Sequence, residues 1–178
     1  TAEERKEAKE FAKQAQIRNQ KDASDRAQKA AQTAEWMWAR GRDEVPVTFK
    51  YCVDKKIKPY GARFLHGNMI IPMYRGKMVG MQTILPEKNE DGVNKIFLTG
   101  SDIVGAYFKI GSLSQDPQQT VYVVEGYATG CSVHHATKLP VIVAFNAGNL
   151  EPVIAGIRAK MPDAKIVIAG DDDRHVLI

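Results

Sequence analysis

The first 40 residues have a thin apolar pattern on a strongly polar background. No Gly or Pro occurs before Gly41, and the residues that dominate the segment, Ala, Lys, Glu, Gln and Arg, favour helices. Alanines recur close to the spacing of one helix face, with the bulky Trp36, Met37 and Trp38 at its end. The pattern predicts one long helix, or a pair of helices with a break near residues 22–25.

From Val45 onward the pattern changes to short β-rich runs separated by Gly and Pro. Residues 69–73 and 78–84 are two such runs, and residues 74–77 between them have the composition of a hairpin turn. Residues 95–98 form a further apolar run. This part of the chain therefore predicts a small, mostly antiparallel sheet.

The last third of the chain alternates short apolar runs with helical segments. The runs are residues 121–124, 141–145 and 166–169, and the intervening residues 128–137 and 150–161 have helical composition. Such alternation is typical of a parallel sheet with helical crossovers. Ligands of these sheets bind beyond the carboxyl ends of the strands.

The patterns together predict an α/β protein in three parts. An N-terminal helical arm occupies residues 1–44, and a small basic, mostly antiparallel β subdomain occupies residues 45–117. A parallel α/β sheet occupies residues 118–178.

Charge is unevenly distributed over the 178 residues, whose net charge is +4. Lys and Arg exceed Asp and Glu by two in residues 1–41 and by four in residues 42–111, but fall short by two in residues 112–178. A polyanion could be held by the basic part, while the acidic part would attract a divalent cation. The alternative is an ordinary solvated surface.

Several classes of protein are excluded by the composition. No apolar run approaches the roughly 20 residues that span a bilayer, and the charged N-terminal segment lacks the apolar stretch of a signal peptide, so we expect a cytoplasmic protein without a membrane partner. Cys52 and Cys131 are far apart in sequence and belong to no CxxC motif. They suggest neither a disulfide framework nor a zinc site.

Acidic residues follow two of the three predicted parallel strands. Glu125 follows the first strand, and residues 171–173 are three consecutive aspartates after the third. Because alternate side chains of an extended segment share a face, Asp171 and Asp173 form a pair, and a bound cation would relieve their repulsion. Carboxylate oxygens suit Mg²⁺, or Mn²⁺, and glycines such as Gly126 allow close approach of a phosphate. The alternative is a solvated loop or a helix N-cap.

Three segments at these strand ends carry a resemblance to a known family. Residues 123–130 (VVEGYATG), 144–150 (AFNAGNL) and 166–173 (IVIAGDDD) resemble the Toprim domain of phage- and plasmid-type DnaG-like primases. The resemblance implies that Glu125 is the acidic residue of the first motif and that Asp171 and Asp173 bind the metal. The family continues beyond its aspartate pair with a helix, an acidic motif and a strand, so we expect an incomplete Toprim domain here.

The preceding residues 51–111 are similar to the basic subdomain that precedes Toprim in those primases. The resemblance places Arg63, Lys77 and Lys95 near the template and the incoming nucleotide, and it adds Gly126 and Asn149 to the nucleotide-binding set. Surface lysines are common, so a solvated face is the alternative for each basic residue.

The function implied by the resemblance is that of a DNA primase catalytic core. Such an enzyme is a nucleotidyltransferase that makes RNA primers on a single-stranded DNA template from ribonucleoside triphosphates, and its expected partner is a replicative helicase. Two alternatives remain open. One is a Toprim nuclease or topoisomerase-like enzyme that cleaves DNA with the same metal site, and the other is a non-catalytic DNA-binding replication module.

Overall fold

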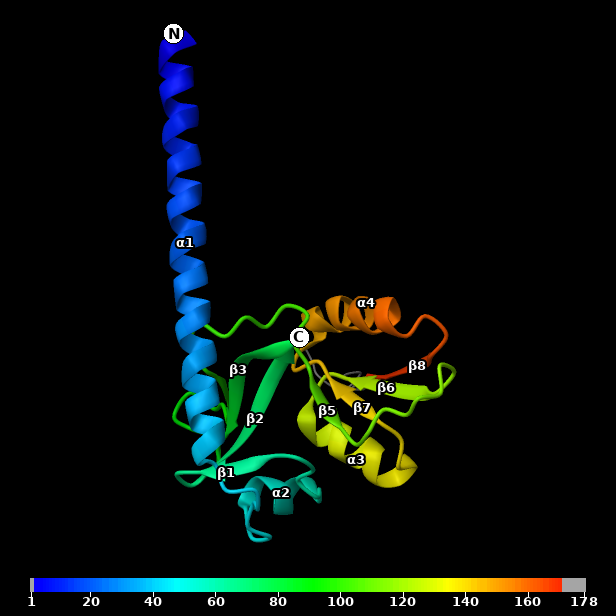
Figure 1. Cartoon of the computed structure of the whole chain (residues 1–178). Helices are drawn as coiled ribbons and strands as arrows, with labels where there is room; N and C mark the ends of the chain where they lie inside the picture. Colours follow the sequence, from blue (N-terminus) through cyan, green and yellow to red (C-terminus); the bar gives the residue numbers. More distant parts are fainter. Residues whose placement is uncertain (1, 171–178) are drawn as a thin grey trace, which may run out of the picture.

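The computed structural model describes residues 2–170 and consists of a long helix and two sheets (Figure 1). The helix lies against one sheet, and the second sheet lies beside the first with a helix on each of its faces (Figure 1). The elements in chain order are α1 (Ala2–Arg40), α2 (Lys50–Lys55), β1 (Arg63–Leu65), β2 (Asn68–Arg75), β3 (Lys77–Ile84), β4 (Lys95–Phe97), β5 (Phe108–Ile110), β6 (Thr120–Val124), α3 (Tyr127–Thr137), β7 (Val141–Val143), η1 (Ala147–Asn149), α4 (Leu150–Lys160) and β8 (Lys165–Ala169).

Helix α1 is continuous, without a break at residues 22–25. Two acidic residues of that segment, Asp22 and Asp25, follow Arg18 and Lys21 by four positions, a spacing at which opposite charges stabilise a helix. The helix ends where Gly41 donates its N–H to carbonyls of the last turn. The long-helix alternative from the sequence is therefore confirmed.

The C-terminal part of α1 packs on the first sheet through small side chains. Ala30 is 3% exposed and Ala34 is fully buried, and this face meets Met78 and Met81 of β3. Alanine at these positions lets the helix backbone lie close to the strands. The sheet thereby fixes the direction in which the rest of α1 projects (Figure 1).

The first sheet has the order β1-β2-β3-β4 and is antiparallel throughout, as predicted. Strands β2 and β3 form the expected hairpin, with Gly76 at φ +74° in the turn. The short helix α2 was not anticipated from the sequence. Its C-cap, Lys56, adopts a left-handed conformation that ends the helix.

The second sheet has the order β5-β7-β6-β8. Strand β6 runs parallel to both β7 and β8, which confirms the predicted parallel core, and α3 and α4 cover opposite faces (Figure 1). Strand β5 pairs antiparallel with β7. It belongs to residues 45–117, which the sequence pattern assigned to the first sheet, but in the structure it completes the second sheet.

One hydrophobic core joins the two sheets. It contains Met69 and Ile71 of β2, Val124 of β6, Val143 of β7 and Tyr127 of α3, all of them at most 1% exposed. Because burial of side chains of this size contributes about 1.5–3 kcal/mol each, the two sheets are held as one packed body. The ends of the parallel strands therefore have a defined position relative to the first sheet.

We predict that both thiols of this core are unreactive in the folded protein. Cys52 and Cys131 are 5% and 1% exposed, and burial raises the pKa of each thiol to about 11. At about pH 8 roughly 0.1% of each thiol is then ionised, so labelling by a disulfide reagent should be about 100-fold slower than for an exposed cysteine. Rapid labelling of the native chain would contradict this, and denaturant should restore a fast reaction of both.

Candidate functional site

The carboxyl ends of β6, β7 and β8 lie side by side. Val124, the last residue of β6, is in register with Val143 of β7 and with Ala169 of β8. Neighbouring strands are about 4.8 Å apart, so the residues that follow these three begin along one edge of the sheet. We call this edge, formed by Val124, Val143, Ala169 and the residues that follow them, the carboxyl edge.

Glu125 stands at the carboxyl edge, directly after β6, and is half-buried. Within the described part of the chain its carboxylate has no recorded hydrogen bond or ion pair. Asp171 and Asp173 lie outside the described residues, which end at Gly170. Residues 2–170 contain no cluster of three or more His, Cys, Asp or Glu that could hold a metal, so the three-carboxylate site stays a prediction.

Lys95 is brought to the carboxyl edge from the first sheet. A Cβ atom built on Gly126 would lie 3.8 Å from Lys95 Nζ, and also 3.8 Å from Thr129 Oγ1. Gly126 is the N-cap of α3 and immediately follows Glu125, so the Lys95 cation lies beside the helix start and next to the acidic position. The structure thus joins three predicted site residues, Lys95, Gly126 and Glu125, from two sheets.

Aromatic packing holds β4 in the position that makes this possible. Phe97 of β4 meets Phe145, which follows β7, edge to face with ring centroids 6.2 Å apart. Phe145 has φ +74°, an uncommon conformation for a bulky residue, which costs on the order of 1 kcal/mol and is held by the surrounding structure. Neither residue was predicted as part of the site, and the apolar runs that contain them gave only a strand signal.

Asn149 has a structural role near the carboxyl edge, where its side chain bonds to the backbone. Its side chain is 3% exposed, its Oδ1 accepts from Gly105 N at 2.6 Å, and its Nδ2 donates to Ala106 O and Ala144 O, both at 2.8 Å. The amide therefore ties the loop before β5 to the end of β7. All its polar atoms are engaged by backbone, and the predicted contact with nucleotide stays untested.

Asn146, three residues earlier, positions the same loop. Its Oδ1 accepts from Asn149 N at 2.9 Å and so caps η1 before α4 begins. The sequence did not single out Asn146, although Asn ahead of a helical segment is a common N-cap signal.

Arg63 lies away from the carboxyl edge. Its guanidinium donates to Trp38 O at 2.6 Å, pairs with Asp43 at 2.6 Å and stacks over the Trp38 ring at 4.3 Å. β1 and β4 are the two outer strands of the first sheet, so about 14 Å of sheet width separates Arg63 from Lys95. In the structure Arg63 anchors the end of α1.

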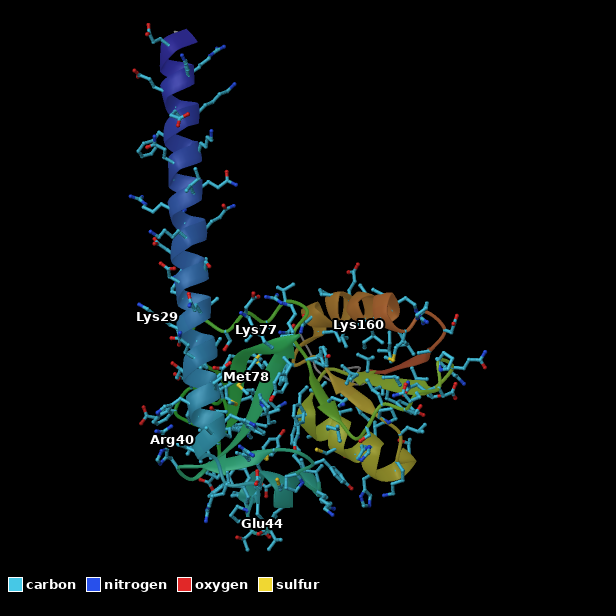
Figure 2. The ribbon with its side chains drawn as sticks, in the orientation of Figure 1. Lys29, Arg40, Glu44, Lys77, Met78 and Lys160 are labelled. Atoms are coloured by element: carbon cyan, nitrogen blue, oxygen red, sulfur yellow. The ribbon has the colours of Figure 1, made fainter. Side chains whose placement is uncertain are left out.

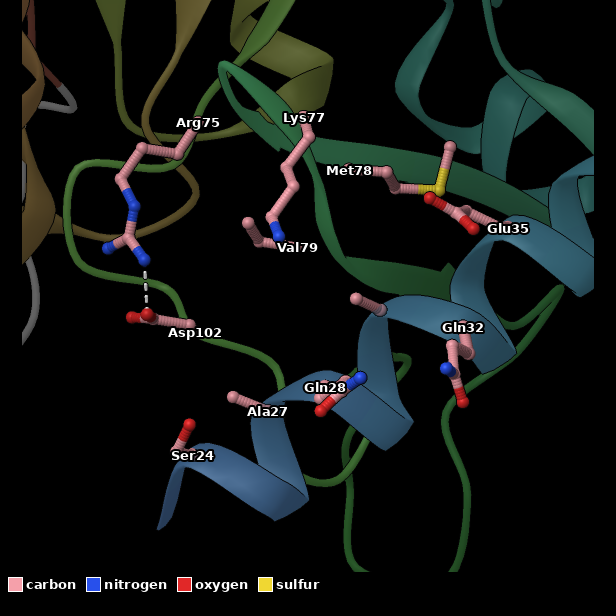
Figure 3. Close-up of a pocket in the computed structure, with 11 residues that line it drawn as sticks. Ser24, Ala27, Gln28, Gln32, Glu35, Arg75, Lys77, Met78, Val79 and Asp102 are labelled. Carbon is pink, nitrogen blue, oxygen red and sulfur yellow. Dashed lines mark hydrogen bonds and ion pairs between the residues drawn. The ribbon is translucent and has the colours of Figure 1, made fainter. Parts of the chain in front are cut away.

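Lys77 lies at the hairpin end of β3, in a groove between this strand and α1. The groove has a volume of about 560 Å³ and is lined by Ala27, Gln28 and Ala31 of α1 on one side and by Lys77 on the other (Figure 3). Arg75 also lines it and pairs with Asp102 (Figure 3). Lys95 is opposite Ile84, seven residues along β3, so about 23 Å separates Lys77 from Lys95 along the strand.

The three predicted basic residues therefore occupy three separate places. Lys95 is at the carboxyl edge, Lys77 is in the groove beside α1, and Arg63 is bound to the end of α1.

Among the described helices none combines the length and apolar character needed to cross a membrane.

Comparison with known proteins identifies relatives of part of the chain. No protein-family model matches it. Two Escherichia coli proteins named DNA primase TraC are similar to it. One is 38% identical over 104 residues, which are 58% of this chain and 7% of the relative. The other is 39% identical over 111 residues, which are 61% of this chain and 10% of the relative.

Among solved structures, the chain is similar to one from a complex of the bacteriophage T7 lagging-strand DNA polymerase with the primase domains of two gp4 subunits, an RNA/DNA hybrid and dTTP. The TM-score is 0.43 and the identity 17%, over 76% of this chain and 68% of the other, which is too distant to establish a shared fold. About 60% of this chain is thus homologous to one segment of a DNA primase, and the chain spans 10% or less of the length of either relative.

Proposed function

We propose that this chain is the catalytic core of a DNA primase, which makes RNA primers on single-stranded DNA by Mg²⁺-dependent nucleotidyl transfer. The observation on which the proposal rests is the 38–39% identity to DNA primase TraC over 104 and 111 residues. The Toprim character of the second sheet, a cytoplasmic location and a replicative helicase as partner belong to the same proposal.

The residues at the carboxyl edge have the chemistry that a divalent cation requires. Glu125 offers a carboxylate without a recorded partner among the described residues, and Asp171 and Asp173 follow the adjacent strand in sequence. Oxygen donors of this kind are the ligands that Mg²⁺ prefers, and Mn²⁺ accepts them as well. We infer that these three carboxylates would hold the metal. When bound, the metal would neutralise charge that develops on the transferred phosphoryl group.

The described residues supply the binding surface for a triphosphate. Lys95 brings a cation to the start of α3, where backbone N–H groups and the helix dipole favour an anion. Gly126 has no side chain, so phosphate oxygens can approach the backbone there. In the proposed reaction the 3′-oxygen of the primer forms a bond to the α-phosphorus of the next ribonucleotide. The bond from that phosphorus to pyrophosphate breaks, and the 3′-hydroxyl proton passes to solvent.

The experiment that tests the proposal is incorporation of labelled ribonucleotides on single-stranded DNA. The protein should form short RNA products with Mg²⁺ or Mn²⁺ and none with a chelator. Cleavage of the DNA without incorporation would instead identify a nuclease or a topoisomerase-like enzyme. Binding of the DNA with neither reaction, unaffected by the chelator, would identify a replication module without catalysis.

Replacing Lys95 by Gln should weaken nucleotide binding while leaving the fold intact. A charge-assisted hydrogen bond is worth about 1.5–3 kcal/mol, so the KM for ribonucleotide should rise about 10-fold or more. Lys88→Gln, in the exposed loop between β3 and β4, is the matched control and should behave as the unsubstituted chain does. Equal KM values for the two variants would remove Lys95 from the nucleotide site.

A further inference from the structure

The N-terminal half of α1 projects beyond both sheets (Figure 1). Along α1, Ala23 and Ser24 are the first residues that line a groove between this helix and the rest of the chain. Residues 2–22 precede them and extend about 30 Å farther out. We call residues 2–22, the projecting part of the helical arm predicted at residues 1–44, the arm. Most helical stability comes from packing of an apolar face, and residues 2–22 line no groove against the sheets, so packing within this chain does not explain the composition of their surface.

Three cations of the arm form a stripe on one face. Arg5, Lys9 and Lys13 are spaced by four residues, about 6 Å apart along the axis. Arg5, Lys9 and Lys13 lie 18 residues before Ala23, Ala27 and Ala31. These three alanines line grooves between α1 and the rest of the chain. Eighteen residues are five full turns, so each cation projects in the same direction as its alanine. Ala27 and Lys77 line the same groove from opposite sides (Figure 3), so the stripe lies on the side of α1 that faces the grooves and Lys77.

The stripe is electrostatically unfavourable for an isolated helix. Like charges four residues apart destabilise a helix by about 0.2–0.5 kcal/mol per pair, and Arg5, Lys9 and Lys13 make two such pairs. In the part of the chain that the structure describes, none of the three makes an ion pair. A bound polyanion would offset this repulsion through its own attraction to each cation.

The opposite face of α1 has a different charge pattern. Arg18, Lys21 and Lys29 each lie four residues from Asp22 or Asp25, so their charges are partly compensated. Lys29 lies on the side of α1 away from the sheets (Figure 2). Of the stripe residues only Lys13 has an acidic residue at a comparable spacing, Glu10 three positions before it, so the uncompensated positive charge in this part of α1 is that of Arg5 and Lys9, on the side that faces the sheets.

We propose that the stripe, continued by Lys77, binds the phosphate backbone of a nucleic-acid duplex that lies along the arm. This extends the proposed function and rests on it for the choice of nucleic acid as the polyanion. Single strands are bound largely by aromatic stacking, and Phe11, the arm's aromatic residue, projects about 160° from Lys9 and Lys13. A membrane surface would require an apolar face, but the exposed Phe11 and Ile17 are about 120° apart around the helix.

The test compares two triple variants of identical composition in the 178-residue chain. R5Q/K9Q/K13Q removes the stripe, and R18Q/K21Q/K29Q removes one arginine and two lysines from the opposite side. Fluorescence anisotropy with labelled DNA and RNA–DNA duplexes of about 20 base pairs, two turns, gives the affinity at several salt concentrations. A chelator is present throughout, so the measurement does not depend on metal or on primer synthesis.

The stripe variant should reduce the slope of log K against log salt by about 3, and the opposite-side variant by less than 1. A charge-retaining variant, K9R/K13R, should bind as the unsubstituted chain does, and circular dichroism should show the same helix content for all. Equal slopes for the two triple variants would overturn the proposal. So would a stripe-dependent affinity that is greater for single strands, or for vesicles containing phosphatidylserine, than for duplexes. Loss of primer synthesis in Glu125→Gln with duplex binding intact would separate this inference from the proposed function.

Discussion

Replacing Glu125 by Gln is expected to reduce ribonucleotide incorporation by about 10²–10⁴-fold, the range found when a group that stabilises the transition state is removed. The substitution keeps the size of the side chain and removes only its charge. Because the Glu125 carboxylate has no recorded partner within residues 2–170, the free energy of unfolding should change by less than about 0.5 kcal/mol. The measurements are labelled-ribonucleotide incorporation and thermal unfolding of the same preparation.

Glu151→Gln is the matched control for this prediction. Glu151 is an exposed residue in the first turn of α4, in the same part of the chain, and it loses the same charge in the same substitution. Its incorporation should remain within about twofold of the unsubstituted value, because surface substitutions of this kind have effects near zero. Full incorporation by Glu125→Gln would remove this residue from the catalytic site. A large fall in melting temperature would give it a structural role instead.

Replacing Asn149 by Asp is expected to have the largest effect on stability. The carboxylate would lose both hydrogen bonds to Ala106 O and Ala144 O and would place a charge against two carbonyl oxygens in a buried position. We expect a loss of about 3 kcal/mol or more at neutral pH, which lowers the melting temperature by about 6–12 °C in a chain of this size.

The loss should depend on pH in a defined direction. Burial beside carbonyl oxygens would raise the pKa of the introduced carboxyl above its unfolded value, so the folded chain would bind the proton more tightly. Stability of the variant relative to the unsubstituted chain is therefore greatest below about pH 4 and falls as pH rises toward neutrality.

Asn146→Asp provides the control, because Asn146 Oδ1 only accepts a hydrogen bond and a carboxylate at an N-cap accepts it equally well. The control should unfold within about 0.5 kcal/mol of the unsubstituted chain. If both variants unfold alike, the buried amide does not hold the loop before β5 to the end of β7.

Most elements of the fold were accessible from local pattern, except α2 and the three-residue strands β1 and β5. Absence of Gly and Pro predicted helix through Arg40, the turn at residues 74–77 predicted the β2–β3 hairpin, and alternating apolar runs predicted the parallel strands. Each of these signals depends on residues close together in the chain. The alternative of two helices with a break near residues 22–25 was wrong, because opposite charges four residues apart stabilise the helix there. Helix α2 was missed because a six-residue helix has too short a pattern to recognise.

The long helix, the hairpin, the parallel strands, the placement of Glu125 at a strand end and the resemblance that suggests a primase all follow from the sequence alone. Which basic residues meet that strand end depends on the tertiary structure, because Arg63, Lys77 and Lys95 belong to strands whose separation is set by sheet order and register. The shared core and the contact between Phe97 and Phe145 bring Lys95 to Gly126, whereas α1 occupies Arg63. Contacts between residues distant in sequence depend on packing of the whole chain, and local pattern contains no record of them.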